Sequence, residues 1–435
     1  MKILFHNATL VTGTKVGIGS IIIEDDKILD IIWDDEERSL EPENLIFDKI
    51  IDLSGMHLIA GGVDPHVHFR EPGLTHKADM STESKAALAG GVTTVMDMPN
   101  TSPTTTSLKA LNEKQEFAKE KAYCNMMFHI GATNNNIEEI LKAIDEKGVA
   151  GIKIFMGSST GNMLVDNDEI LEKIFSITEK PILVHSEDEA IIKANLERAI
   201  SRYGDDIPFQ EHENIRSRTA CIKSSIKALE LAIKHGTKLT LCHISTKEEL
   251  EMVRAAKIQN PNIVAETSCN YLWFTNEAYK ILGSLVKCNP AIKEEKDRCA
   301  LIEGLRNGLV DIIGSDHAPH QLSEKNNVYT KAPSGLPTIQ QTLSVLLTIA
   351  KKEDIPLERI AQVFSEKASE IYKLDTGKLK KDYKADFVIF DLDKEYKVLN
   401  EDQFSKCGWT PYAGETIFGV IDSVYLNGIK VKLSP

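Results

Sequence analysis

Asp64-Pro65-His66-Val67-His68-Phe69-Arg70-Glu71-Pro72-Gly73 follows an apolar run at residues 57–63 that predicts a short buried strand. Two histidines separated by one residue on an extended chain point to the same side. Paired neutral imidazoles on one face can hold one metal ion and suit zinc. The planar fork of Arg70, two residues beyond His68, suits a carboxylate. The motif indicates an enzyme acting on a small acidic molecule; the alternative is a His-x-His that merely ends a strand.

The middle of the chain alternates between apolar runs and helical patterns, which predicts an α/β fold with a parallel sheet. The runs are 57–63, 92–98, 124–130, 150–156, 181–185, 238–243, 262–267 and 310–315. The helical patterns are 78–89, 107–121, 136–147, 167–179, 215–235, 246–258, 294–307 and 338–372. Eight strands close a TIM (β/α)8 barrel, in which reactive side chains lie at the carboxyl ends of the strands and in the loops after them.

Both ends of the chain contain short Ile/Val-rich strands separated by turn residues, including an Asn427-Gly428 hairpin signal. They predict one small β-sandwich domain made from residues 1–54 and 376–435. The barrel domain is expected at residues 55–375.

Composition limits the function classes. The 435 residues carry a net charge of −14, which argues against nucleic acid or an anionic membrane as the main partner. The seven scattered cysteines contain no Cys-x-x-Cys pair, so neither a disulfide framework nor a zinc ribbon is indicated. No secretory signal is evident and no apolar run approaches the ~18–20 residues of a membrane span, so a cytoplasmic location is expected.

Further reactive residues fall at the predicted strand ends. They are Asn100, Lys153, His185, His243 and Asp316. Four histidines and a carboxylate on one barrel rim suit two metal ions, each with two histidines. Lys153 lies inside an apolar strand, where a charged amine is costly to bury. It is either a snorkelling or ion-paired lysine, or a neutral amine that reacts with carbon dioxide to give a carbamate able to bridge two cations.

Together these residues resemble the binuclear amidohydrolase superfamily, most closely its cyclic-amidohydrolase branch of dihydroorotases, hydantoinases and allantoinases. The resemblance covers nearly the whole chain and includes the Lys153–Gly161 stretch, which fits the branch with a bridging carboxylysine. It implies two zinc ions bridged by N6-carboxylated Lys153. It implies one ion held by His66 and His68 with Asp316, and the other by His185 and His243.

Within the branch, three residues favour dihydroorotases: Arg70, Asn100 and His320. In that group they hold the substrate carboxylate, and dihydroorotate has one exocyclic carboxylate beside its scissile ring amide. The implied reaction interconverts dihydroorotate and N-carbamoyl-L-aspartate in de novo pyrimidine (UMP) biosynthesis. A hydroxide bridging the zinc ions is the expected nucleophile, and Asp316 the expected general acid/base.

Two more residues are expected to touch the substrate. Asn289 resembles the Asn-Pro segment that contacts the pyrimidine ring, although Ala291-Ile292-Lys293 departs from the usual Pro-Leu-Arg. Thr160 lies in a small polar loop suited to a mobile lid. Asn270 receives no role, because many relatives carry a histidine pair near it.

Two alternative functions stay open. A hydantoinase, dihydropyrimidinase or allantoinase would keep the chemistry and change the substrate. An inactive scaffold for aspartate transcarbamoylase would lack metal ligands, whereas all six expected ligands are present. The resemblance implies a homo-oligomer, specifically a dimer, and is compatible with association with aspartate transcarbamoylase.

Overall fold

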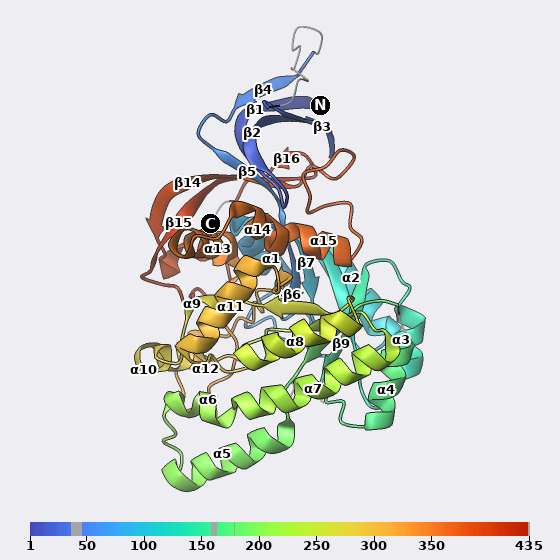
Figure 1. Cartoon of the computed structure of the whole chain (residues 1–435), viewed down its shortest axis with the longest axis vertical. Helices are drawn as coiled ribbons and strands as arrows, with labels where there is room; N and C mark the ends of the chain where they lie inside the picture. Colours follow the sequence, from blue (N-terminus) through green and yellow to red (C-terminus); the bar gives the residue numbers. More distant parts are fainter. Residues whose placement is uncertain (36–45, 158–162, 178, 434–435) are drawn as a thin grey trace.

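Strands from both ends of the chain form one eight-stranded sheet in the computed structural model, which describes residues 1–35, 46–157, 163–177 and 179–433. The strands are β1 (Lys2–Val11), β2 (Val16–Glu24), β3 (Lys27–Trp33), β4 (Lys49–Asp52), β5 (His57–Ala60), β14 (Phe387–Lys397), β15 (Thr416–Leu426) and β16 (Ile429–Lys430). Their order is β16-β15-β14-β5-β1-β2-β3, with β4 added beside β1. The sheet forms the upper part of Figure 1, away from the helices in residues 189–259.

This terminal sheet folds over a core of its own. Phe5 on β1 meets Tyr425 on β15 with ring centroids 5.0 Å apart, although the two strands are three places apart in the sheet. Phe387 on β14 stacks on Tyr425 at 4.7 Å. Rings from distant strands therefore meet in one core, and the prediction of a small β domain built from both termini is confirmed.

The middle of the chain forms the predicted parallel barrel. Its strands follow the sequence order: β6 (Gly62–Val67), β7 (Val92–Asp97), β8 (Asn125–Gly131), β9 (Val149–Phe155), β10 (Ile182–His185), β11 (Leu239–Leu241), β12 (Val264–Thr267) and β13 (Ile312–Ile313). The ends of the series meet where the His68 amide donates to the His317 carbonyl at 2.8 Å and Val67 forms a parallel bridge with His317. The TIM-barrel prediction is confirmed.

The apolar run at 57–63 is two strands rather than one. β5 pairs with β1 and β14 in the terminal sheet, whereas β6 pairs with β7 in the barrel. The terminal sheet thus extends past the expected boundary at residue 54, and the barrel begins at Gly62. A Cβ at Gly61 would lie 2.2 Å from the Thr93 hydroxyl, so only glycine fits where the chain crosses between the sheets.

The predicted helical stretches correspond to α1 (Met80–Ala89), α2 (Leu108–Lys121), α3 (Ile137–Ala143), α4 (Asp168–Ser176), α7 (Arg218–His235), α8 (Lys247–Gln259), α11 (Glu295–Asn307), and α13 (Thr342–Glu353), α14 (Leu357–Ala361) and α15 (Lys367–Ile371). The sequence did not predict α5 (Glu189–Tyr203), α6 (His212–Ile215), α9 (Cys269–Trp273), α10 (Ala278–Leu282) or α12 (Leu322–Lys325). Short 3-10 or π turns are η2 (Phe209–Glu211), η3 (Gly283–Val286), η4 (Ile339–Gln341), η5 (Gln362–Glu366) and η6 (Asn400–Asp402).

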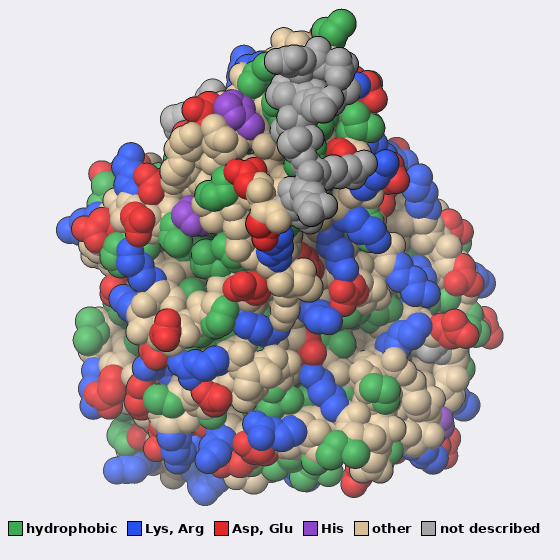
Figure 2. All heavy atoms as spheres, turned by 45° about the horizontal axis from the view of Figure 1, so that its top comes forward, with side chains coloured by type: hydrophobic (Ala, Val, Ile, Leu, Met, Phe, Trp, Pro, Cys, Tyr) green, Lys and Arg blue, Asp and Glu red, His purple; other side chains and the backbone are tan. Residues whose placement is uncertain are grey.

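Two surface properties bear on the possible partners of the chain. Among the described residues, none of the helices has the length and apolar character needed to cross a membrane. On the face drawn in Figure 2, basic and acidic side chains alternate and no large area carries one sign of charge. That face offers no basic surface of the kind that binds nucleic acid.

Candidate active site

The predicted site residues converge on one cavity of about 330 Å³ at the carboxyl ends of the barrel strands. Among its lining residues are His66, His68, Arg70, Asn100, Lys153, His185, His243, Asn289, Asp316 and His320. Thr160, the remaining predicted contact, lies outside the described residues.

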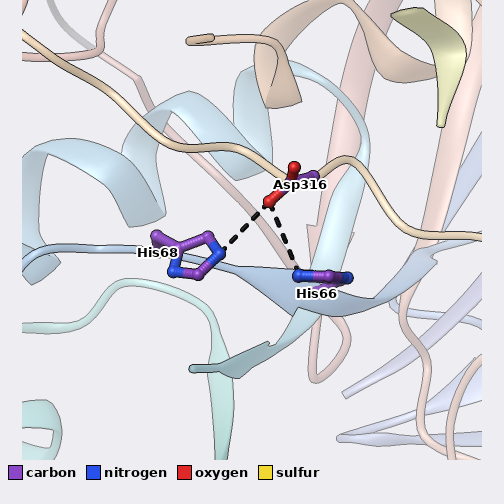
Figure 3. Close-up of side chains that lie close together, drawn as sticks. All are labelled: His66, His68 and Asp316. Carbon is purple, nitrogen blue, oxygen red and sulfur yellow. Dashed lines mark ion pairs between the residues drawn. The ribbon is translucent and has the colours of Figure 1, made fainter. Parts of the chain in front are cut away.

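The first cluster joins the opening motif to the end of the barrel. The Asp316 Oδ1 atom lies 3.5 Å from His66 Nε2 and 3.1 Å from His68 Nε2. Figure 3 draws the three side chains facing one another across this gap. Two ligands bound tetrahedrally at about 2.0–2.1 Å lie roughly 3.3 Å apart. The separations therefore fit a shared metal ion.

His185 and His243 form the second cluster. His185 Nδ1 lies 3.0 Å from His243 Nε2, again close to the edge of a tetrahedral coordination shell. Both side chains are buried, and both line the same cavity as the first cluster. The donor set of four imidazoles and one carboxylate is the kind that zinc prefers.

Lys153, on β9, lines the same cavity as the two clusters and is fully buried. Its Nζ atom contacts Cys242 Sγ at 3.5 Å and lies 5.2 Å from the centre of the Phe155 ring. No ion pair with Lys153 occurs among the described residues, so the ion-paired alternative finds no support there. A buried amine beside two clusters of candidate metal ligands is suited to carbamate formation.

Hydrogen bonds fix which imidazole nitrogen faces the cavity. His66 Nδ1 lies 2.6 Å from Glu266 Oε1, and His68 Nδ1 lies 2.7 Å from Asn100 Oδ1. Because an amide oxygen and an ionised carboxylate oxygen can only accept, Nδ1 carries the proton in this arrangement and Nε2 keeps a lone pair for a metal. Asn100 consequently turns its NH2 group, a double donor, away from His68.

His185 is oriented in the same way by its other nitrogen. His185 Nε2 donates to Glu187 Oε2 at 2.9 Å, which leaves Nδ1 as the free acceptor. The Glu187 carboxylate is itself held by Arg216, whose Nε atom lies 3.0 Å from Oε2. Glu187, Arg216 and Glu266 are therefore supporting residues that the sequence analysis missed. An acidic residue inside or just after an apolar strand is the signal that marks both glutamates.

The protonation states of the four histidines and Asp316 favour the binding of cations. Burial lowers the pKa of His66, His68, His185 and His243, so the imidazoles are neutral near pH 7. Burial alone would raise the pKa of Asp316; His66 and His68 hold it below its usual range while they carry a proton, and a bound cation would take over that effect when the rings are neutral. The carboxylate is thus ionised and can act as a ligand and a base.

Three residues in the site have left-handed backbone conformations. Arg70, His243 and Asp316 have φ values of 65°, 39° and 47°. Such conformations are unfavourable for residues with a Cβ and cluster at functional sites. They let the chain turn sharply after a strand and direct a side chain over the barrel mouth.

Arg70 and His320 form the polar end of the cavity. Arg70 Nε donates to the Pro319 carbonyl at 3.1 Å, and its terminal NH2 lies 3.0 Å from His320 Nε2. Arg70 is 7% exposed and forms no ion pair with the described residues. Nearby, the buried Oδ1 atom of Asn289 has no hydrogen-bond partner in the described structure. The Arg70 guanidinium and the Asn289 Oδ1 atom can therefore both bind a ligand in the cavity.

Asn270 lies apart from this chemistry. Its Oδ1 atom accepts a hydrogen bond from the buried Tyr412 hydroxyl at 3.0 Å. The residue joins α9 to the segment between β14 and β15, which accounts for an amide at this position without a role in the reaction.

Comparison with known proteins agrees with this geometry. The profile of the amidohydrolase family matches residues 57–429. The chain is 34% identical over 391 residues to a dihydroorotase from Methanosarcina mazei, covering 87% of this chain and 83% of that protein. It is 31% identical over 418 residues to a dihydroorotase from Clostridioides difficile, covering 94% of each. The solved L-hydantoinase (dihydropyrimidinase) from Arthrobacter aurescens superposes with a TM-score of 0.93 at 27% identity, over 99% of this chain and 95% of that one.

The chain belongs to the amidohydrolase family. Within that family, the curated relatives named above are dihydroorotases, while the similar solved structure is a hydantoinase. The choice between the two substrates depends on the cavity.

Proposed function

We infer that this chain is a dihydroorotase, a metal-dependent cyclic amidohydrolase that interconverts dihydroorotate and N-carbamoyl-L-aspartate. The observation that carries the inference is Arg70, a buried guanidinium that faces the cavity without a carboxylate partner among the described residues. A buried charge is costly unless it is paired. The carboxylate of dihydroorotate supplies that partner, whereas an apolar hydantoin does not.

Four side chains bind and orient the ring in this proposal. Arg70 pairs with the exocyclic carboxylate, and the Asn100 NH2 group donates to its oxygens. The His320 Nε2–H, which faces the Ser334 carbonyl at 3.1 Å, lies beside Arg70 at the same end of the cavity and would share its hydrogen bond with that carboxylate. The free Asn289 Oδ1 atom accepts a hydrogen bond from a ring N–H. Anchoring the carboxylate on one side and the ring on the other brings the scissile amide over the metal ligands.

The proposed metal ligands are those expected from the sequence: His66, His68 and Asp316 for one ion, and His185 and His243 for the other. Carboxylated Lys153 would bridge the two ions. Two zinc ions bound here would supply hydroxide near neutral pH and polarise the ring carbonyl. The neutral imidazoles and the buried Lys153 support this assignment.

Asp316 moves the proton. Its carboxylate is ionised before the reaction, so an Oδ atom can accept the proton of the attacking nucleophile. It then returns the proton to the departing ring nitrogen as the amide opens. In the biosynthetic direction, the same carboxylate takes the proton from the ureido nitrogen as that nitrogen closes on the side-chain carboxyl group.

The test is a substrate panel with metal analysis on the same purified protein. Dihydroorotate, carbamoyl aspartate, dihydrouracil, hydantoin and allantoin are assayed at equal concentrations. We expect turnover of the first two, with about two zinc ions per chain. Turnover of dihydrouracil without turnover of dihydroorotate would instead assign a dihydropyrimidinase. The accompanying proposals of a homodimer and of association with aspartate transcarbamoylase are tested by sedimentation, with and without that enzyme.

A further inference from the structure

Two buried lysines beside the cavity have no part in the reaction described above. Lys325, at the end of α12, is fully buried, and Lys287 is 7% exposed. Neither forms an ion pair with any residue of the described structure. Buried lysines are rare because the ammonium loses its hydration, so the bonds that replace water must be accounted for.

The buried ammonium of Lys325 forms hydrogen bonds to three backbone carbonyls in place of water. Its Nζ atom donates to Lys287 O at 3.1 Å, Pro333 O at 2.9 Å and Gly335 O at 3.1 Å. Burial lowers the pKa of Lys325 to about 7. An ammonium has three N–H donors, one for each of these carbonyls, so the three hydrogen bonds favour the charged form. The side chain thus ties together two segments that are distant from each other in sequence.

Lys287 also binds the loop at residues 329–335, which contains two of the carbonyls bound by Lys325. Its Nζ atom donates to Tyr329 O at 2.7 Å and Ala332 O at 2.6 Å, and it lies 4.2 Å from the centre of the Tyr329 ring. Its own carbonyl accepts the Gly335 amide at 2.9 Å as well as the Lys325 ammonium. The two lysines together make five hydrogen bonds to backbone carbonyls, four of them in residues 329–335.

This loop is in direct contact with the candidate active site. Residues 332–335 line the cavity, and His320 Nε2 lies 3.1 Å from Ser334 O. A Cβ on Gly335 would lie 2.6 Å from Ala318 O and 3.0 Å from His320 Cδ2, so the loop backbone presses against the segment that carries His320. A shift of the loop would therefore move His320 relative to Arg70.

We propose that Lys287 and Lys325 are positioning residues that clamp the loop at residues 329–335 and thereby hold His320 in place for the substrate carboxylate. The part of this proposal that concerns the carboxylate rests on the proposed function. The clamp itself does not, because it consists of contacts within the chain.

The test compares Lys325→Met and Lys287→Met with Lys331→Met, which removes an exposed lysine from the same loop. Hydrogen–deuterium exchange is followed in peptides that cover residues 328–338, and zinc content and kinetics are measured on the same samples. We expect loop exchange to quicken about tenfold in both clamp variants and to stay unchanged in the control. The KM for dihydroorotate should rise about tenfold with little change in kcat and with normal zinc content.

A double variant checks that the lysines act on one loop. Because they share it, Lys287→Met combined with Lys325→Met should raise KM by less than the product of the single effects. If Lys325→Met does not fold, Lys287→Met supports the test with the same measurements. Unchanged loop exchange, loss of zinc, or a fall in kcat at constant KM would each overturn the clamp. Failure of the wild-type protein to turn over dihydroorotate would instead refute the proposed function, and loop exchange would still test the clamp.

Discussion

At the scale of single residues, Arg70 carries the specificity of the site. It adopts a left-handed backbone conformation, lies buried, and meets only neutral groups among the described residues: the Pro319 carbonyl and His320. Burial lowers its pKa to about 10, which still leaves the guanidinium charged at neutral pH. The free energy spent on burying this charge is recovered only when an anion binds.

Replacing Arg70 tests this assignment directly. In Arg70→Met, kcat/KM for dihydroorotate should fall about 100-fold, because two charge-assisted hydrogen bonds are lost. Zinc content should be normal, since the hydrogen bonds of Arg70 go to Pro319 and His320 and not to a proposed metal ligand. The exposed Arg202→Met serves as the matched control. Steady-state kinetics with normal kcat/KM in Arg70→Met would contradict the role of this residue.

Lys153 is the second residue whose chemistry can be isolated. Lys153→Ala should lose most of its zinc and activity, because the bridging carbamate cannot form. A short carboxylic acid added at millimolar concentration should restore part of both, since it offers two oxygens in the same space. In the wild type, labelled bicarbonate should give a carbamate carbon signal by NMR. Full activity of Lys153→Ala would refute the bridge.

At the scale of elements, the sequence located most strands, and the residues that it proposed as metal ligands line one cavity. The alternation of apolar runs marks β7 to β13, and the residues at their ends reach one cavity because parallel strands share one carboxyl edge. The split between β5 and β6 was not predictable, because a continuous apolar run does not reveal which sheet each half pairs with. Glu187 and Glu266 were missed for a related reason: their partners are set by folding rather than by a motif.

Glu266 connects two of these strands. It lies on β12, accepts from His66 Nδ1 on β6, and its Oε1 atom also lies 3.3 Å from the His243 amide. Glu266→Gln should weaken zinc binding about 10- to 100-fold, because the amide no longer enforces the His66 tautomer. Competition with a fluorescent zinc chelator measures this loss. The exposed Glu230→Gln on α7 should leave affinity unchanged; equal affinities in both variants would contradict the prediction.

At the scale of the whole molecule, the terminal sheet is joined to the active site by the segment between β14 and β15. The Lys406 amide donates to Glu83 Oε1 at 3.0 Å, and Glu83 Oε2 lies 2.6 Å from His317 Nε2. Three residues further along, the Trp409 indole N–H donates to the His320 carbonyl at 2.8 Å. Both bonds reach the segment that follows Asp316, so the terminal sheet supports the substrate end of the cavity.

Trp409→Phe removes this N–H donor and keeps most of the buried ring. The His320 carbonyl then loses its partner, which should lower the free energy of unfolding by about 1–3 kcal/mol. The KM for dihydroorotate should rise severalfold while zinc content stays normal, because the change reaches His320 and not the ligands. Trp33→Phe, on β3 of the terminal sheet, is the control for KM and should leave it unchanged. A lower melting temperature with unchanged KM would mean that this segment stabilises the fold without positioning His320. The contact between the terminal domain and the barrel would then contribute to stability and not to substrate binding.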